Sequence, residues 1–254
     1  MEILSEMKPM KRIKSGIKGF DDLIDGGIIE GSTVLVSGKT GSGKTVFGLQ
    51  FLYNGATKFE EPGIFVTLET RPDELRDEAA QFGWDLRSLE NKNALFIVDA
   101  ASSKAGQPTS EKYALRRGFD MGTFAEEIYK AIQETNAKRL VIDCISGLGI
   151  GFNEPFQVRN ELFRIIALLR ELKVTSILIS EILDSDSHSR AGVEQFVTNG
   201  LVTLDLTEVN GTLKRKLLIW KMKQTKHSLK AQPFTIGKSG IEIITKKKSG
   251  KKSS

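Results

Sequence analysis

The stretch GKTGSGKT, residues 38–45, constrains this chain most, because it lies between the apolar run STVLVS and a helical pattern. It fits G-x-x-x-x-G-K-[ST], the phosphate-binding loop (P-loop) pattern, which needs a strand before it and a helix after it. Its glycines let backbone N–H groups turn toward one point, which the N-terminus of the next helix also faces. A dinucleotide fingerprint does not fit, since Val46 occupies its third glycine position. The loop predicts a nucleoside triphosphate site.

Two side chains of this loop carry specific chemistry. Lys44 can reach the β- and γ-phosphate oxygens of ATP, and the Thr45 hydroxyl is placed to bind Mg²⁺. ATP and Mg²⁺ are therefore the expected cofactors. The residues expected to bind nucleotide are Gly38, Lys39, Thr40, Gly41, Ser42, Gly43, Lys44, Thr45 and Val46. A glycine-rich turn that binds nothing is the alternative, and the flanking patterns argue against it.

Composition narrows the class of protein. The chain of 254 residues has one cysteine, Cys144, which excludes an internal disulfide framework and a multi-cysteine metal site. Its two histidines, His188 and His227, lie far apart and offer no metal-ligand spacing. No apolar run reaches membrane-spanning length, and the N-terminus lacks a secretory apolar segment. We expect a cytoplasmic protein that makes no membrane contact.

The distribution of charged residues distinguishes the C-terminal segment from the rest of the chain. The net charge is +5, and the final TKKKSGKKSS contains five lysines and no acidic residue. Such a composition is typical of a disordered, solvated tail. We expect an N-terminal extension over residues 1–10, a single domain over 11–245 and a disordered lysine-rich tail over 246–254.

Apolar, β-rich runs alternate with helical patterns between residues 33 and 181. Strands joined by crossover helices form a parallel sheet with both faces covered. Farther on, two strand patterns flank Asn210-Gly211, a strong hairpin signal, and residues 232–244 indicate a second hairpin. The expected fold class is α/β, with a mostly parallel central sheet flanked by helices and C-terminal antiparallel strands.

The last long helical pattern, in FQVRNELFRIIALLRELK, carries a one-sided apolar stripe. Phe163, Ile166, Ala167 and Arg170 follow the three-to-four spacing of a helix. We expect this stripe to face the core.

Hydrolysis of a triphosphate also needs a metal ligand. The run RLVID ends in Asp143, and ligands of such sheets bind outside the carboxyl ends of the strands. Asp143 is therefore expected to bind Mg²⁺ together with Thr45. The alternative is a simple cap or turn residue.

A group that activates water must come from another strand, because the residue after Asp143 is Cys144 and not an acid. GIFVTLET offers Glu69, which would face the γ-phosphate if its strand neighbours the P-loop strand. The alternative is that Glu69 favours the start of the helix at RPDEL. Ser180 or Glu181, at the end of ILISE, is a further candidate for contact with the γ-phosphate.

These features resemble the RecA superfamily of ATPases, and in particular its KaiC-like branch. The stretch GIKGFDDLIDGGIIEGSTVLVSGKTGSGKT resembles the opening of a KaiC domain, and GVEQFVTNGLVTL, WKMKQTKHS and PFTIGKSGIEI are similar to its later blocks. The resemblance covers residues 11–245 and implies a RecA-like P-loop ATPase. The chain departs from the family at Thr70, where a second glutamate is usual, and at Lys221-Met222-Lys223, where the family has Lys-x-Arg.

The resemblance implies a homo-oligomer, a hexameric ring in which ATP lies between subunits. Lys221 and Lys223 would reach the nucleotide of the neighbour, pointing the same way as strand residues two apart. Hydrolysis should be slow, because a lysine lacks the bidentate fork of arginine. The family's clock proteins carry two such domains, whereas this chain has the length for one, and no circadian role is implied.

A second hypothesis is an ATP-dependent module of the recombinase (RadA paralogue) type that binds single-stranded nucleic acid. The loop SSKAGQPTSEKYALRRGFD contains Lys112, Tyr113, Arg116 and Arg117, and the tail adds lysines. Basic residues with an interleaved aromatic can track a strand and stack on a base. The alternative for this loop is a solvated cover over the sheet.

Overall fold

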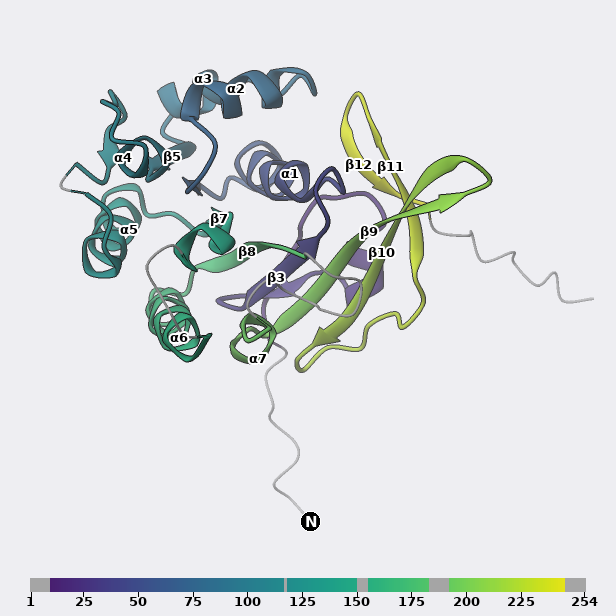
Figure 1. The fold of residues 1–254 in the computed structure, drawn as a ribbon. Helices are drawn as coiled ribbons and strands as arrows, with labels where there is room; N and C mark the ends of the chain where they lie inside the picture. The colour runs from purple at the N-terminus through teal and green to yellow at the C-terminus, as the bar shows by residue number, and fades with distance from the viewer. Residues whose placement is uncertain (1–9, 117, 150–154, 183–191, 245–254) are drawn as a thin grey trace, which may run out of the picture.

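The computed structural model describes residues 10–116, 118–149, 155–182 and 192–244 (Figure 1). Of the predicted terminal segments 1–10 and 246–254, residues 1–9 and 246–254 lie outside the described residues. A ten-stranded sheet has the order β12-β11-β10-β9-β3-β8-β7-β4-β5-β6. Its strands are β3 (Thr33–Gly38), β4 (Gly63–Thr67), β5 (Leu95–Asp99), β6 (Tyr113–Ala114), β7 (Arg139–Asp143), β8 (Thr175–Glu181), β9 (Gly200–Val209), β10 (Thr212–Met222), β11 (Gln232–Gly237) and β12 (Gly240–Ile243).

The sheet is parallel from β9 to β6 and antiparallel from β9 to β12. This arrangement confirms the predicted α/β class and both C-terminal hairpins. Asn210 and Gly211, with φ of 53° and 73°, form the turn between β9 and β10. The sequence did not indicate that β9 would also pair in parallel with β3, which places the first hairpin beside the P-loop strand.

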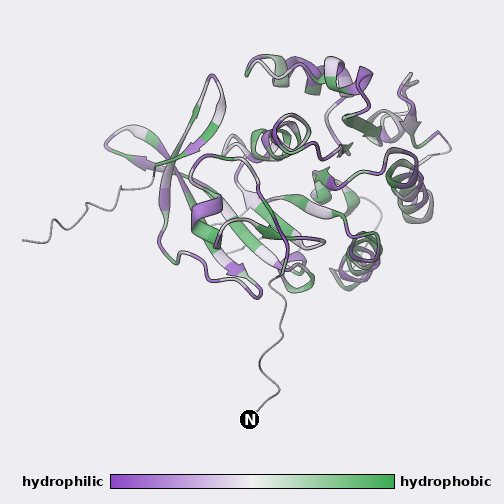
Figure 2. Cartoon of the chain, turned by 180° about the vertical axis from the view of Figure 1, so that it is seen from behind, coloured by the Kyte–Doolittle hydropathy of each residue, from purple (hydrophilic) through white to green (hydrophobic). Residues whose placement is uncertain are grey.

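Helices cover both faces of the parallel strands, as Figure 1 shows. They are α1 (Lys44–Lys58), α2 (Pro72–Ala80), α3 (Leu86–Asn91), α4 (Ala101–Lys104), α5 (Met121–Thr135), α6 (Pro155–Glu171) and α7 (Glu194–Val197), with 3-10 turns η1 (Asp21–Ile24) and η2 (Ile145–Gly149). Helices α1, α2 and α3 bury apolar residues against one face, and α5 and α6 against the other. Hydrophobic residues run along the central strands in Figure 2. The N-terminal strands β1 (Arg12–Ile13) and β2 (Ile28–Ile29) pair separately.

The predicted core stripe of α6 is wrong except at Ile166. Phe163 is 62% exposed, and Ala167 and Arg170 are exposed as well. The buried residues of the helix are Val158, Leu162, Ile165, Ile166 and Leu169. This stripe also satisfies helical spacing, and it offers the sheet five branched aliphatic side chains, so its burial removes more apolar surface from water.

Arg139, the first residue of β7, is a buried cation that joins three parts of the chain. It forms a 2.6 Å ion pair with Glu61 and donates hydrogen bonds to the carbonyl oxygens of Phe51 (2.9 Å) and Lys14 (2.8 Å). Burial lowers the pKa of Arg139, and Glu61 acts in the opposite direction. The residue ties the N-terminal segment and α1 to the sheet.

Candidate functional site

The P-loop connects the end of β3 to the start of α1. Gly41 and Gly43 have φ of 77° and 102°, a conformation that side chains rarely adopt. A β-carbon on Gly43 would lie 2.6 Å from the Ile236 side chain, so this close approach also requires glycine. The Lys44 ammonium donates to the carbonyl oxygens of Gly38 (2.8 Å) and Lys39 (3.0 Å), inside the curve of the loop. Burial lowers the pKa of Lys44, while nearby acidic groups act in the opposite direction.

Thr45 and Asp143 meet across the first turn of α1 and the end of β7. The Thr45 hydroxyl donates a 2.6 Å hydrogen bond to a carboxylate oxygen of Asp143. Burial raises the pKa of Asp143 to about 6, although Thr45 and Lys44 favour the charged form. Among the described residues, no three His, Cys, Asp or Glu side chains gather into a metal-binding group. This pair of oxygens fits Mg²⁺, which usually takes one or two protein ligands and fills its shell with phosphate and water.

A cavity of about 520 Å³ opens beside the P-loop, within the size range of small-molecule sites. It brings together residues of the P-loop and α1, residues at or beyond the ends of β4, α2, β7, β8 and β11, and one residue inside β10. The lining residues are Thr40, Gly41, Gly43, Lys44, Thr45, Val46, Glu69, Thr70, Glu78, Phe82, Asp143, Cys144, Glu181, Arg215 and Ile236. The cavity thus joins the predicted cradle, the predicted metal ligands and the predicted base.

Glu69 lines this cavity, but for a different reason from the one expected. Its strand β4 does not neighbour β3, because β8 and β7 lie between them. The condition stated for Glu69 is therefore not met, and Glu69 reaches the cavity from the segment beyond β4, next to Asp143 at the end of β7. The helix that follows begins at Pro72 and has Asp73 and Glu74 in its first turn, so Glu69 lies before the helix.

Arg215 of β10 is a cavity residue that sequence reasoning missed. Its guanidinium donates a 3.4 Å hydrogen bond to the Gly41 carbonyl oxygen, and its Nε is buried without a hydrogen-bond partner in the described residues. Phe82 and Ile236 add apolar walls. No local motif marks these residues: Arg215 and Ile236 reach the P-loop through the pairing of β9 with β3, and Phe82 follows α2.

The two other candidates, Ser180 and Glu181 at the end of β8, lie in different environments. Glu181 lines the cavity and accepts a 2.7 Å hydrogen bond from the Thr40 hydroxyl. Ser180 is buried and donates to the Glu194 carboxylate at 3.3 Å. Of the two residues, Glu181 is placed to contact a nucleotide.

Lys221 and Lys223 lie away from the cavity of their own chain. Strand β10 ends at Met222 and its register shifts between Ile219 and Lys221, so the expected strand alternation does not extend to Lys223. The Lys221 ammonium donates to the carbonyl oxygens of Gln195 (2.6 Å) and Thr198 (2.8 Å) at the end of α7. Lys223 is exposed.

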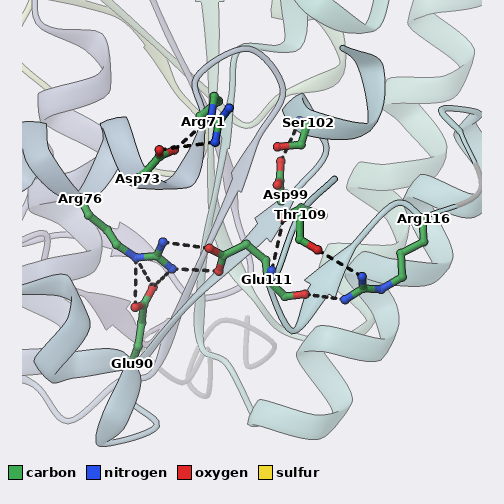
Figure 3. Close-up of polar contacts among 9 residues, drawn as sticks. All are labelled: Arg71, Asp73, Arg76, Glu90, Asp99, Ser102, Thr109, Glu111 and Arg116. Atoms are coloured by element: carbon green, nitrogen blue, oxygen red, sulfur yellow. Dashed lines mark hydrogen bonds and ion pairs between the residues drawn. The ribbon is translucent and has the colours of Figure 1, made fainter. Parts of the chain in front are cut away.

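The described residues of the loop considered for nucleic-acid binding make contacts within the chain. Tyr113 is 1% exposed in β6 and donates to Glu134 at 2.9 Å, so it is not available to stack on a base as the second hypothesis required. Arg116 donates to the carbonyl oxygens of Thr109 and Glu111 (Figure 3). Lys112 forms a 3.4 Å ion pair with Glu134, and Arg117 and the lysine tail lie outside the described residues.

Within residues 10–116, 118–149, 155–182 and 192–244, no helix combines the length and the apolar composition needed to cross a bilayer.

The fold and this cavity define a P-loop ATPase of the RecA type. The family model described as "ATPase: KaiC" matches residues 13–248, and the chain belongs to the KaiC-like ATPase family. This result confirms the resemblance stated from the sequence.

Similar proteins include single-domain and longer family members. The UPF0273 protein PH0284 of Pyrococcus horikoshii is 40% identical over 239 residues, which are 93% of this chain and 95% of that protein. The circadian clock oscillator protein KaiC of Parathermosynechococcus lividus is 39% identical over 242 residues, but this chain spans only 44% of its length. The crystal structure of the KaiC-like protein PH0186 from Pyrococcus horikoshii OT3 superposes with a TM-score of 0.81 at 42% identity, covering 93% of this chain and 100% of that one.

Proposed function

We propose that this chain is a slow, Mg²⁺-dependent ATPase whose single domain, residues 11–245, works at the subunit interfaces of a cytoplasmic homo-oligomeric ring, expected to be hexameric. The observation that carries the proposal is the cavity in which Lys44, the Thr45–Asp143 pair and Glu69 face one space. Phosphoryl transfer requires a cradle, a metal ligand and a water-activating group, and these residues supply all three.

Each residue has a separate part in this proposal. Lys44 and the loop amides would bind the β- and γ-phosphates, and Thr45 and Asp143 would hold Mg²⁺, whose charge would stabilise the phosphate oxygens. Glu69 takes a proton from the attacking water. Glu69→Gln should therefore retain ATP binding and lower turnover by roughly 10²-fold.

The ring is supported by an apolar groove on the face of α6 and α7. The groove has a volume of about 810 Å³ and contains Phe156, Phe163 and Phe196, with exposed fractions of 67, 62 and 63%. Exposed apolar patches of this kind mark interaction sites. Lys223 lines the same groove, so a second copy seated there would receive this ammonium near its surface.

Mixing two inactive variants tests the shared site. Lys44→Ala should abolish ATP binding, and Lys223→Ala should lower turnover by about 10²-fold, less than the loss known for arginine fingers. In mixed rings, a Lys223→Ala subunit has an intact P-loop and can use Lys223 of a Lys44→Ala neighbour, so activity should return. Each variant mixed with itself is the control.

Two results would contradict the proposal. Normal ATP affinity in folded Lys44→Ala would refute the P-loop assignment. Co-assembly of the two variants without recovery of activity would refute completion of the site by a neighbour. A nucleic-acid function has weaker support, because the aromatic residue on which it depended, Tyr113, is buried.

A further inference from the structure

Lys104, the last residue of the short helix α4, lies behind the cavity. Its ammonium donates a 3.0 Å hydrogen bond to the carbonyl oxygen of Gly147 in η2, and it lies 5.6 Å from the centre of the Phe119 ring. Lys104 is not among the residues that line the cavity. Its charge can therefore affect the cavity only through a neighbouring residue that lines the cavity.

That residue is Glu69. A β-carbon placed on Gly147 would lie 2.8 Å from the Lys104 Nζ and 3.1 Å from a carboxylate oxygen of Glu69. The two charged atoms are thus separated by no more than the sum of these distances. An opposite charge at such a separation favours the ionised form of a carboxyl group. Gly147 leaves room for both side chains because it has no β-carbon.

Several contacts hold α4 in this place (Figure 3). The Asp99 carboxylate accepts a 2.9 Å hydrogen bond from the Ser102 N–H at the start of α4. After the helix, Glu111 forms a 2.8 Å ion pair with Arg76 of α2. Helix α2 follows Glu69 directly in the chain, so this ion pair joins the segment carrying Lys104 to the segment carrying Glu69.

Negatively charged groups around Glu69 repel its carboxylate, and a nearby cation offsets this repulsion. Asp143, Glu78 and Glu181 line the same cavity, and Lys44 and Arg215 are cations on the P-loop side. Bound ATP would add further negative charge in front of Glu69. Burial lowers the pKa of Lys104, while the nearby charge of Glu69 acts in the opposite direction, as expected for two groups that lie close together.

We propose that Lys104 is a positioning residue that keeps the Glu69 carboxylate directed at the attacking water. The inference rests on the proposed role of Glu69 as the base. Lys104 touches neither nucleotide nor water in this proposal. It offsets the repulsion between Glu69 and the triphosphate, and its bond to Gly147 fixes the distance.

The test compares ATP turnover and ATP affinity of the full chain in four changes at two positions. Lys104→Met should lower turnover about tenfold and leave the ATP dissociation constant within about twofold, because the charge acts on the base and not on the nucleotide. Lys104→Arg should restore most of the activity. Lys104→Gln keeps a donor for the Gly147 carbonyl without the charge, and should behave like Lys104→Met. The control is Lys92→Met, which removes an exposed lysine after α3.

A double change separates positioning from folding. When Glu69 is already glutamine, adding Lys104→Met should not reduce the residual turnover further. Thermal unfolding of every variant shows whether it is folded, and Lys104→Gln replaces Lys104→Met if the latter is not.

Three results would overturn the inference: wild-type turnover in both Lys104→Met and Lys104→Gln, an equal loss in the Glu69→Gln background, or no recovery with arginine. If Glu69→Gln itself has wild-type turnover, the proposed function loses its base. If Glu69→Gln is inactive and the Lys104 variants are fully active, only the inference about Lys104 fails.

Discussion

Asp143→Asn should stabilise the protein when neither Mg²⁺ nor nucleotide is present. The wild-type carboxylate must ionise in a partly buried position, and burial raises its pKa from the usual 3.8 to about 6. Asparagine carries no charge and can still accept the hydrogen bond from the Thr45 hydroxyl. The variant therefore avoids the cost of holding an ionised carboxylate in the folded state.

The magnitude and its pH dependence follow from the two pKa values. The difference between the two pKa values corresponds to about 3 kcal/mol, and the residual solvent exposure of Asp143 reduces this to about 2 kcal/mol. Because the folded-state pKa is the higher one, the protonated group stabilises the wild type below pH 4, and this contribution is lost as the pH rises to about 6. The advantage of Asp143→Asn should thus be small at pH 4 and complete at pH 7, equivalent to about 4–8 °C in melting temperature.

The assay is thermal unfolding in EDTA at several pH values between 4 and 8. Asp77→Asn, which removes an exposed carboxylate from α2, is the control and should show no such trend. Adding Mg²⁺ and ATP should then stabilise the wild type much more than Asp143→Asn. A stability difference that does not change with pH, or a less stable Asp143→Asn at pH 7, would refute the reasoning.

Two further predictions concern cations outside the cavity, and both are measured by urea unfolding. Lys221→Ala should lower the free energy of unfolding by about 1–3 kcal/mol, because two backbone carbonyls at the end of α7 lose this donor, whereas Lys223→Ala should change it by less than about 0.5 kcal/mol. Equal losses would contradict the separation of these lysines into a structural and an exposed one. Arg139→Ala should cost about 3–5 kcal/mol, since it breaks a buried ion pair, and Arg164→Ala, in an exposed pair on α6, should cost at most about 1 kcal/mol. A small loss at Arg139 would show that its contacts add little.

Local motifs were enough to predict much of the fold and the centre of the site. The P-loop pattern and the apolar runs depend on backbone chemistry and strand burial, which are encoded within a few residues. Asp143 was placed at the site because ligands of such sheets bind outside the carboxyl ends of the strands. The Asn210-Gly211 turn was equally direct.

Features that depend on long-range pairing were not predicted. Two stripes of α6 satisfy helical spacing, and only the sheet decides that Leu162 and not Phe163 is buried. Tyr113 resembled an exposed aromatic because nothing local indicates that β6 joins β5. Arg215 and Lys104 reach the site from elements far from the P-loop in sequence, and no motif connects them.

The position of β9 has a mechanical consequence. This strand pairs with the P-loop strand on one side and with the strand leading to Lys223 on the other. Gly38 lies opposite Leu204 of β9 and Lys221 lies opposite Leu201, three residues away on the same strand. Bending one relative to the other would break main-chain hydrogen bonds across the sheet. In a ring of the proposed kind, each protomer would then tilt as a rigid body when its own site fills, and the tilt would move Lys223 at the neighbouring site. The stiffness of β3, β9 and β10 would then determine how filling of one site affects hydrolysis at the next.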